Sequence, residues 1–554
     1  MSQKKELLIF GLDGATFDLL DPWFDRGELS FLESIIDSGV SGKMRSTIPP
    51  NSGPAWTSFQ TGVNPGKHGI FDWGSARVDT YRQGMVNASS VQAKTIWRLI
   101  GEAGKRVGVI GVPVTYPPQA VNGFMTTGVL TPKESEDYVY PPELRKGIEK
   151  EVGSYRVAPP HAEMALNKRR WIEELKRSIE NKEKTALHLL STQKWNVSMV
   201  YFMETDTVSH HLFPEGIESE KKDKNLNDKP REPVLEIYRR VEKAVKRIYD
   251  RTAEEDTHVM IVSDHGFGPL KWIFNVNSWL LENGYLQLKQ SALIRIKKAI
   301  SKLGLNQKNL YKVGNLLGPL ARGNEWEMEG FNDILGKLFL SLKDVDWKNT
   351  KAYSRGGVTG ALRLNVKGRE PSGWIYPEDV PAIRDELTGA LRDLRNPYTG
   401  ELVVDRVLKN EEVYEGPSSF YGPDILFKTR GLRTDTGGMT VFKSLDPIIP
   451  GFAINGTHRM EGIFGAAGPK YARGLEVEGL KILDPAPIIL HTLGLKIPSY
   501  MDGTPRKGVF SDEFWSNNQP EFWETKLPDL NQPGEDNKHE EEIKERLMEL
   551  GYLA

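Results

Sequence analysis

The chain has 554 residues, 38% hydrophobic and 27% charged, so it is long enough for more than one domain and for a large buried core. Its formal net charge of −2 provides no general electrostatic attraction to nucleic acid or to an anionic membrane. The sequence contains no cysteine, which excludes disulfides, thiolate metal sites and a cysteine nucleophile. Any metal ion must therefore be bound by carboxylate, imidazole or hydroxyl groups.

Short apolar runs alternate with amphipathic segments from the N-terminus to about residue 284. Four of these runs are rich in apolar side chains and predict buried strands: Leu7–Phe10, Val107–Ile110, Val197–Phe202 and Val259–Val262. Residues 234–249 carry apolar side chains at three- and four-residue spacing, which predicts a helix. This alternation predicts an α/β fold with a mainly parallel central sheet flanked by helices.

A basic segment then interrupts the pattern. Residues 283–323 contain eight lysines and arginines and no acidic residue, and part of this stretch has the apolar spacing of an amphipathic helix. We predict a basic helical insertion that caps the site; the alternatives are a solvated pair of surface helices and a helix on a membrane surface. The predicted domains are a first part of the core (1–285), the cap insertion (286–350), a second part of the core (351–510) and an acidic C-terminal tail with a short helix (511–554).

Acidic and imidazole side chains follow three of the predicted strands. Asp13 comes after the first apolar run, Asp206 and His210 after the third, and Asp264 and His265 directly after the fourth. Open α/β sheets form their sites at the carboxyl ends of strands, so we expect these side chains to share one edge. The adjacent pair Asp264 and His265 is the strongest signal, because both side chains can bind one divalent cation.

Two further candidates lie outside these strands. His458 lies far downstream in the segment 456–462, and Ser52 lies early, directly before a Gly-Pro pair that suits the start of a helix. A serine hydroxyl is a weak nucleophile at its ordinary pKa, and binding to a cation can activate it without a neighbouring base. The alternative role for Ser52 is a helix N-cap, and Thr47 and Thr57 are the rival hydroxyls.

Together these motifs resemble the alkaline phosphatase superfamily, and most closely its type I phosphodiesterase/nucleotide pyrophosphatase branch. The motifs are Gly-Leu-Asp-Gly at 11–14, Ser52 nine residues before Thr-Gly, Asp206-x-x-Ser-His210, Asp264-His265-Gly and the downstream His458. The resemblance covers most of residues 1–280 and about 455–505. It implies an alkaline phosphatase-like fold, a small-molecule phosphate ester as substrate, and two divalent ions bridged by the reacting phosphate.

The resemblance also implies a role for each residue. One ion is expected on Asp13, Asp264 and His265, and the other on Asp206, His210 and His458, with Ser52 as the nucleophile and a further metal ligand. Three aspartates and three histidines form mixed oxygen and nitrogen sites, which suit zinc, with manganese as the alternative.

Two positions depart from the family pattern. Ser209 replaces the glycine of the Asp-x-x-Gly-His motif, which leaves His211 as a rival to His210. Trp73 stands where nucleotide diesterases usually have the asparagine that holds a phosphate oxygen. The preference for monoester or diester and the nature of the leaving group therefore stay open.

We predict a two-metal phosphohydrolase that cleaves phosphomono- or phosphodiesters through a phosphoseryl intermediate on Ser52. The alternatives are a phosphomutase of the cofactor-independent phosphoglycerate mutase type, with residues 286–350 as its closing domain, and a non-catalytic metal or ligand binder. A sulfatase is disfavoured because Ser52-Gly-Pro-Ala-Trp56 lacks the arginine of the sulfatase motif.

The sequence also suggests where the protein works. Residues 1–6 lead directly into the first apolar run without room for a signal sequence, so we expect a cytoplasmic protein. No run of 18 or more apolar residues predicts a transmembrane segment, so the only membrane association that we expect is weak peripheral contact through the basic segment. We expect no nucleic acid polymer as a partner, and the oligomeric state is not predicted.

Overall fold

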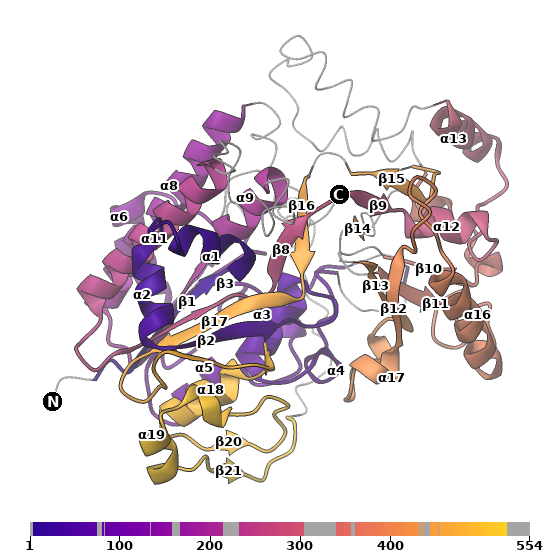
Figure 1. Cartoon of the computed structure of the whole chain (residues 1–554). Helices are drawn as coiled ribbons and strands as arrows, with labels where there is room; N and C mark the ends of the chain where they lie inside the picture. Colours follow the sequence, from indigo (N-terminus) through magenta and orange to yellow (C-terminus); the bar gives the residue numbers. More distant parts are fainter. Residues whose placement is uncertain are drawn as a thin grey trace.

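A ten-stranded sheet with helices on both faces forms the larger part of the computed structural model (Figure 1). The structure describes residues 4–74, 80–81, 84–132, 135–157, 167–213, 232–303, 340–355, 360–430, 434–435, 442, 444–451 and 454–528. The sheet has the order β18-β2-β17-β7-β1-β6-β3-β4-β5, and β19 also pairs with β2. The strands are β1 (Leu7–Leu12), β2 (Val40–Arg45), β3 (Val107–Val112), β4 (Gly123–Thr127), β5 (Val139–Tyr140), β6 (Val197–Phe202), β7 (His258–Val262), β17 (Glu461–Ala467), β18 (Leu475–Glu476) and β19 (Leu480–Lys481).

The centre of this sheet is parallel and buried on both faces. β7, β1, β6, β3 and β4 are neighbours that run parallel, and β17 pairs antiparallel with both β7 and β2. All six residues of β1 are buried, and alternate side chains enter two separate hydrophobic cores. A strand that is covered on both faces has a continuous apolar sequence, which is why these strands were recognisable. The predicted fold class is confirmed.

Two sets of helices cover the faces. One core lies under α1 (Phe17–Phe24), α2 (Ser30–Ser38), α6 (Arg145–Val152), α8 (Lys168–Thr192), α9 (Glu204–Leu212) and α11 (Glu232–Thr252). The other lies under α3 (Ser52–Thr61), α5 (Ile96–Glu102) and α18 (Pro485–Thr492). The short α4 (Pro65–His68) follows α3, and β20 (Ile497–Pro498), α19 (Asp512–Asn517) and β21 (Phe522–Trp523) extend this second side.

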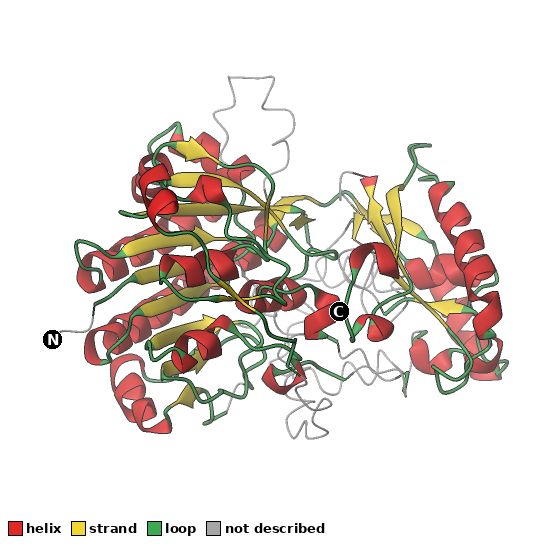
Figure 2. Cartoon of the chain, turned by 90° about the horizontal axis from the view of Figure 1, so that it is seen from below, coloured by secondary structure: helices red, strands yellow, loops and turns green. Residues whose placement is uncertain are grey.

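A smaller four-stranded sheet forms a second part of the molecule, beside the first (Figure 2). Its order is β10 (Ala352–Tyr353), β11 (Gly360–Leu364), β13 (Ile425–Thr429) and β12 (Val404–Lys409). It packs with α12 (Val276–Glu282), α13 (Ala292–Lys302), α16 (Val380–Arg392) and α17 (Asn410–Val413), and its hydrophobic core draws on residues 274–448. The strands β9 (Trp272–Phe274), β14 (Thr434–Asp435) and β15 (Ile448–Pro450) form a small sheet of their own.

This arrangement differs from the expectation that the core resumes at residue 351. Among the described residues, the main sheet takes no strand between β7 and β17, because β10 to β13 pair with one another. Apolar and polar side chains alternate over residues 361–366, which is typical of a strand, but the sheet that a strand joins depends on distant partners. Much of the expected cap insertion, and residues 529–554 of the expected C-terminal tail, lie outside the described residues. None of the described helices combines the length and apolar composition that a membrane-spanning segment needs.

Candidate metal centre

Three adjacent strands of the main sheet bring five of the candidate ligands to one edge. β1 pairs in parallel with β6 on one side and with β7 on the other. Asp13 follows β1, Asp264 and His265 follow β7, and Asp206 and His210 lie on α9, which begins just after β6. Only His210 among these five is partly exposed; the other four side chains are buried.

Two other elements complete the cluster. β16 (Gly456–Arg459) pairs antiparallel with β8 (Gly266–Pro269), the strand that directly follows His265, and this pairing brings His458 to the site. Ser52 is the first residue of α3, and the side chain of Asn51 caps that helix by accepting a hydrogen bond from the backbone N–H of Gly53 at 3.1 Å. The N-cap is therefore Asn51, which leaves the buried Ser52 hydroxyl directed at the cluster.

The first group contains Asp13, Asp264 and His265. His265 Nε2 lies 3.5 Å from Asp13 Oδ1 and 3.3 Å from Asp264 Oδ2. Ser52 Oγ lies 3.2 Å from His265 Nε2 and 3.4 Å from Asp13 Oδ1. One donor atom from each of the three candidate ligands lies within 4.8 Å of the others, which is close enough for one cation.

The second group is built around Asp206. Its Oδ1 lies 3.3 Å from His458 Nε2 and 3.5 Å from His210 Nε2. His265 also has a ring nitrogen within 4.8 Å of donor atoms of Asp206 and His458, and its ring stacks on that of His458 with centroids 3.6 Å apart. The two groups therefore adjoin at His265. His211, the rival to His210, instead packs edge-on against Trp171.

The hydrogen bonds of the three imidazoles test whether the cluster fits metal ions. Nδ1 of His210, His265 and His458 faces the backbone carbonyl of Gly456, Gly266 and Pro50, respectively, at 3.3, 3.0 and 2.7 Å. A carbonyl only accepts, so each Nδ1 carries the proton and each Nε2 directs a lone pair into the cluster. His210 Nε2 and His458 Nε2 are only 3.0 Å apart, and neither neutral ring can donate to the other. A bound cation would satisfy both, so the residues fit metal ions.

The buried charges support the same conclusion. Burial and the nearby carboxylates of Asp264 and Asp206 raise the pKa of Asp13 well above its ordinary value. Burial raises the pKa of Asp264 to about 7, and it lowers that of His265 well below its usual range, with help from His458. Carboxylates this close repel one another without a cation between them.

Several supporting residues were not identified from the sequence. The indole N–H of Trp56 donates to Asp13 Oδ2 at 3.1 Å, and the hydroxyl of Tyr201 donates to the same oxygen. A buried ion pair between Lys182 and Glu204, with a shortest distance of 3.1 Å, lies at the start of α9. Trp56 lies four residues after Ser52 and Glu204 two residues before Asp206, but the contacts themselves depend on tertiary packing.

Trp73 occupies the position where the family usually has an asparagine. The residue is buried, and its ring lies over Gly53, where an added Cβ would be 3.4 Å from the indole. Its neighbour Asp72 is partly exposed and accepts hydrogen bonds from the Asn51 side chain at 3.0 Å and from the Trp73 backbone N–H at 2.8 Å. Trp73 therefore packs beside the nucleophile segment, and Asp72 holds that segment through Asn51.

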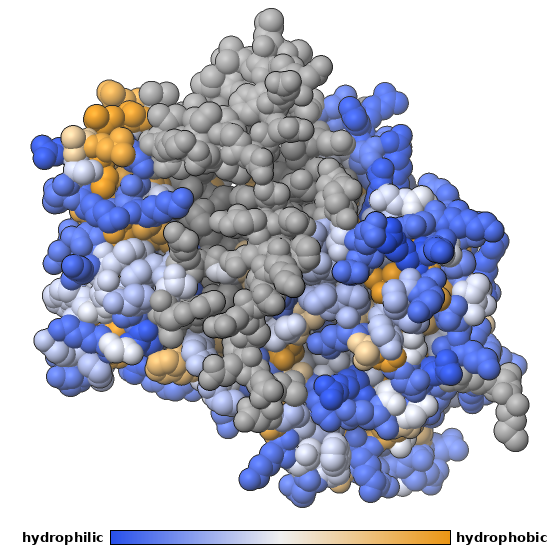
Figure 3. Space-filling model, turned by 180° about the vertical axis from the view of Figure 1, so that it is seen from behind, coloured by the Kyte–Doolittle hydropathy of each residue, from blue (hydrophilic) through white to orange (hydrophobic). Residues whose placement is uncertain are grey.

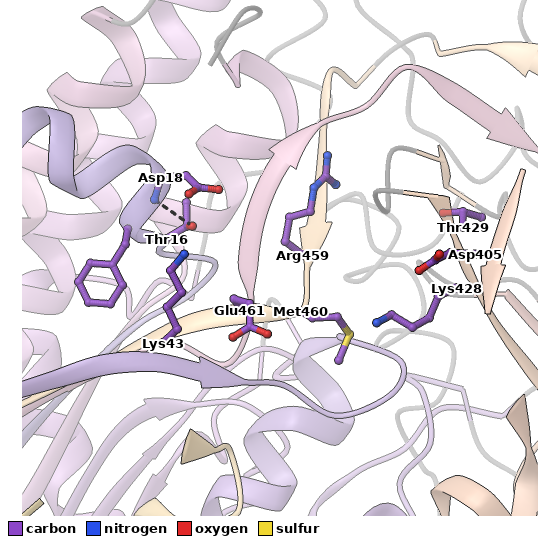
Figure 4. A pocket seen from close by; sticks show the side chains of 10 residues that line it. Thr16, Asp18, Lys43, Asp405, Lys428, Thr429, Arg459, Met460 and Glu461 are labelled. Atoms are coloured by element: carbon purple, nitrogen blue, oxygen red, sulfur yellow. Dashed lines mark hydrogen bonds between the residues drawn. The ribbon is translucent and has the colours of Figure 1, made fainter. Parts of the chain in front are cut away.

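A cavity of about 330 Å³ lies between the two parts of the molecule (Figure 4). Lys43 of β2 contributes to its wall from the main sheet, and Asp405 and Lys428 of β12 and β13 contribute from the smaller sheet. Arg459 also lines it, but its guanidinium is tied to backbone carbonyls, including that of Pro269 at 2.7 Å. None of the seven candidate site residues lines this cavity.

The fold and the cluster define an α/β protein with a buried site for divalent cations, and comparison with known proteins identifies the family. A model of the type I phosphodiesterase / nucleotide pyrophosphatase family matches residues 7–423. The chain belongs to this family, which is part of the alkaline phosphatase superfamily, and is a phosphoric ester hydrolase. The predicted resemblance is confirmed, and the family gives no support to the mutase alternative.

Two solved structures are similar to this chain. Murine ectonucleotide pyrophosphatase/phosphodiesterase 5 is 14% identical, with 91% of this chain and 100% of that chain covered and a TM-score of 0.49. The human protein of the same name is also 14% identical, with 93% and 99% covered and a TM-score of 0.45.

Proposed function

We propose that the protein hydrolyses small-molecule phosphomono- or phosphodiesters through a phosphoseryl intermediate on Ser52, with two divalent cations bound by the six candidate carboxylate and imidazole ligands. The observation that carries the proposal is the position of Ser52 Oγ, 3.2 Å from His265 Nε2 and 3.4 Å from Asp13 Oδ1. A buried hydroxyl in this position adjoins the atoms that would hold a cation. The mixed oxygen and nitrogen donors favour zinc, with manganese as the alternative.

The proposed reaction has two displacements at phosphorus. Ser52 Oγ forms a bond to phosphorus as the ester P–O bond breaks, and the leaving oxygen takes up a proton. A water molecule then attacks the phosphoserine, releasing phosphate or a phosphomonoester and restoring the serine hydroxyl. When bound, the cations would lower the pKa of the attacking hydroxyl and water and offset negative charge on the phosphoryl oxygens.

The chain's own residues hold this geometry in place. Asn51 fixes the start of α3 and thus the position of Ser52, and its side-chain amide is held by Asp72. Trp56 and Tyr201 orient the carboxylate of Asp13 by donating to its Oδ2. Orientation of this kind holds reacting groups near their productive arrangement before the substrate binds.

Substitution of the nucleophile tests the proposal. With zinc or manganese added, Ser52→Ala should lower the hydrolysis of p-nitrophenyl phosphate and bis-p-nitrophenyl phosphate by at least about 1,000-fold. Thr57→Val, five residues later in the same helix, is the control; its hydroxyl donates to the Gly53 carbonyl at 2.7 Å and should not be needed for catalysis. Full activity in Ser52→Ala, together with normal metal content, would rule out the proposed nucleophile.

The same substrates separate the remaining alternatives. Faster turnover of the bis ester would indicate a diesterase and faster turnover of the mono ester a phosphatase, and release of phosphate from 3-phosphoglycerate without rearrangement would argue against a mutase. A metal-loaded protein that is inactive on all three compounds would favour a non-catalytic binder. The cytoplasmic location stays a prediction from the sequence.

A further inference from the structure

The helix α13 presents an apolar face to solvent. Leu293, Ile296 and Leu303 have 57%, 55% and 81% of their surface exposed. With 3.6 residues per turn, these three side chains and that of Ile300 fall within roughly 80° of arc around the helix. In Figure 3, apolar side chains gather at the upper left corner, where α13 lies when the view of Figure 1 is turned around. Exposed apolar surface of this kind marks a site of interaction.

The side of α13 next to this face is fixed to the body of the protein. Ile294 is buried in the core of the smaller sheet. Lys297 is also buried, and its ammonium group pairs with Asp344 at 2.9 Å. The Ser291 hydroxyl caps the helix by accepting from the Ile294 backbone N–H at 3.2 Å. The apolar face is therefore held outward by a folded helix rather than left exposed by a loose segment.

The sequence of α13 and the residues just before it is basic. Residues 286–303 include five lysines and arginines and no acidic residue, although the whole chain has a net charge of −2. Lys297 is neutralised by Asp344, whereas Arg295 and Lys302 are exposed and border the apolar face on one side. At roughly 100° per residue, Arg295 lies about 120° and Lys302 about 140° from the middle of that face. Long basic side chains at this position can reach anionic headgroups while the apolar face enters the interface.

We propose that the α13 face, defined by Leu293, Ile296, Ile300 and Leu303, docks the protein on the surface of an anionic lipid bilayer. Among the described residues, Arg295 and Lys302 have no ion-pair partner, and an apolar stripe bordered by such positive charge matches the boundary between acyl chains and anionic headgroups. A second copy of this chain matches it less well, because it would bring the same positive charges together. The helix lies flat on the membrane and does not cross it, so the association is reversible.

Vesicle binding by the full chain tests this proposal. Flotation with phosphatidylcholine vesicles that contain phosphatidylglycerol should give at least tenfold stronger partitioning than phosphatidylcholine alone, and this gain should fall as salt is added. The double substitution Leu293→Ser with Ile296→Ser should weaken binding to the anionic vesicles at least tenfold. The control Phe420→Ser removes an equally exposed aromatic residue, 57% exposed, from a different surface and should bind as the parent does.

Two further measurements make the result decisive. Hydrolysis of bis-p-nitrophenyl phosphate in solution should be unchanged in the double variant, because α13 contributes no residue to the candidate metal centre. Arg295→Gln with Lys302→Gln should weaken binding to the anionic vesicles and leave the weak binding to neutral vesicles unchanged. Absence of vesicle binding by the parent protein would overturn the proposal. The proposal would also be overturned if the parent protein were a dimer in solution and the double variant Leu293→Ser with Ile296→Ser were a monomer.

Discussion

Asp72 provides a test of how burial of charge beside the candidate nucleophile affects stability. Burial raises the pKa of Asp72 from its ordinary value of 3.8 to about 6, against hydrogen bonds from Trp73 and Asn51 that favour the charged form. The folded protein therefore holds this proton more tightly than the unfolded chain does. The charged carboxylate destabilises the fold increasingly as the pH rises from about 4 to about 6, and fully above that range. Asp72→Asn should remove this effect and keep both hydrogen bonds.

The expected gain follows from the two pKa values. At 1.36 kcal/mol per pH unit, a difference of about two units corresponds to about 3 kcal/mol at pH 8 and to about half of that at pH 5. Because Asp72 is partly exposed, solvent screening lowers the full value, and we expect about 1–2 kcal/mol at pH 8. The variant should therefore be more stable than the parent at both pH values, with the larger gain at pH 8.

Urea unfolding of the metal-free protein at pH 5 and pH 8 measures this difference. The exposed Asp137 supplies the matched control, since Asp137→Asn removes one negative charge without changing a buried group. That control should shift the free energy of unfolding by less than about 0.5 kcal/mol at both pH values. An Asp72→Asn variant that is less stable than the parent, or equally stabilised at both pH values, would refute the reasoning.

Three more predictions concern the metal centre. Trp56→Phe removes the indole donor to Asp13 and should weaken zinc binding by about 10–100-fold in a competition with a chelator, whereas unchanged affinity would contradict this supporting role. Gly14→Ala should lower both metal affinity and activity by more than about tenfold, because an added Cβ would lie 2.9 Å from the Phe267 ring. Gly27→Ala is its control, with a nearly identical φ of +67° but no atom within 4 Å, so equal losses in both variants would point to backbone strain alone. Removal of the metal with a chelator should lower the midpoint of thermal unfolding. Zinc at about 100 times its dissociation constant should then raise the free energy of unfolding by about 2.7 kcal/mol per site. A midpoint that does not change when zinc is added would contradict binding to the folded state.

The sequence predicted the core of the fold well because its strands are buried on both faces. Leu7–Leu12 is apolar throughout, Val197–Phe202 is apolar apart from Ser198 and the hydroxyl of Tyr201, and acidic side chains follow where each run ends. The polar residues at the strand ends were enough to select five of the residues that the structure brings together, whereas Ser52 and His458 lie outside these strands. The sequence could not assign β10 to β13 to a separate sheet, because strand pairing depends on segments far apart in the chain.

The contacts that support the site could not be predicted from the sequence either, because they join residues that are far apart in the chain. Trp56 donates across 43 positions and Tyr201 across 188 positions to one oxygen of Asp13. Neither side chain differs in local sequence from an ordinary core aromatic. Their roles arise only when α3 and β6 pack against the end of β1.

His458 lies on β16, which pairs with β8 but follows all four strands of the smaller sheet in the chain. It is therefore the last of the candidate metal ligands to be synthesised. During synthesis, the ribosome releases Asp13, Ser52, Asp206 and Asp264 long before His458 emerges. The nascent chain therefore holds an unfinished set of donors while nearly two hundred residues are still being added. A cation bound at this stage would have fewer ligands than in the folded protein. Full affinity for the metal ion therefore requires that β16 has paired with β8.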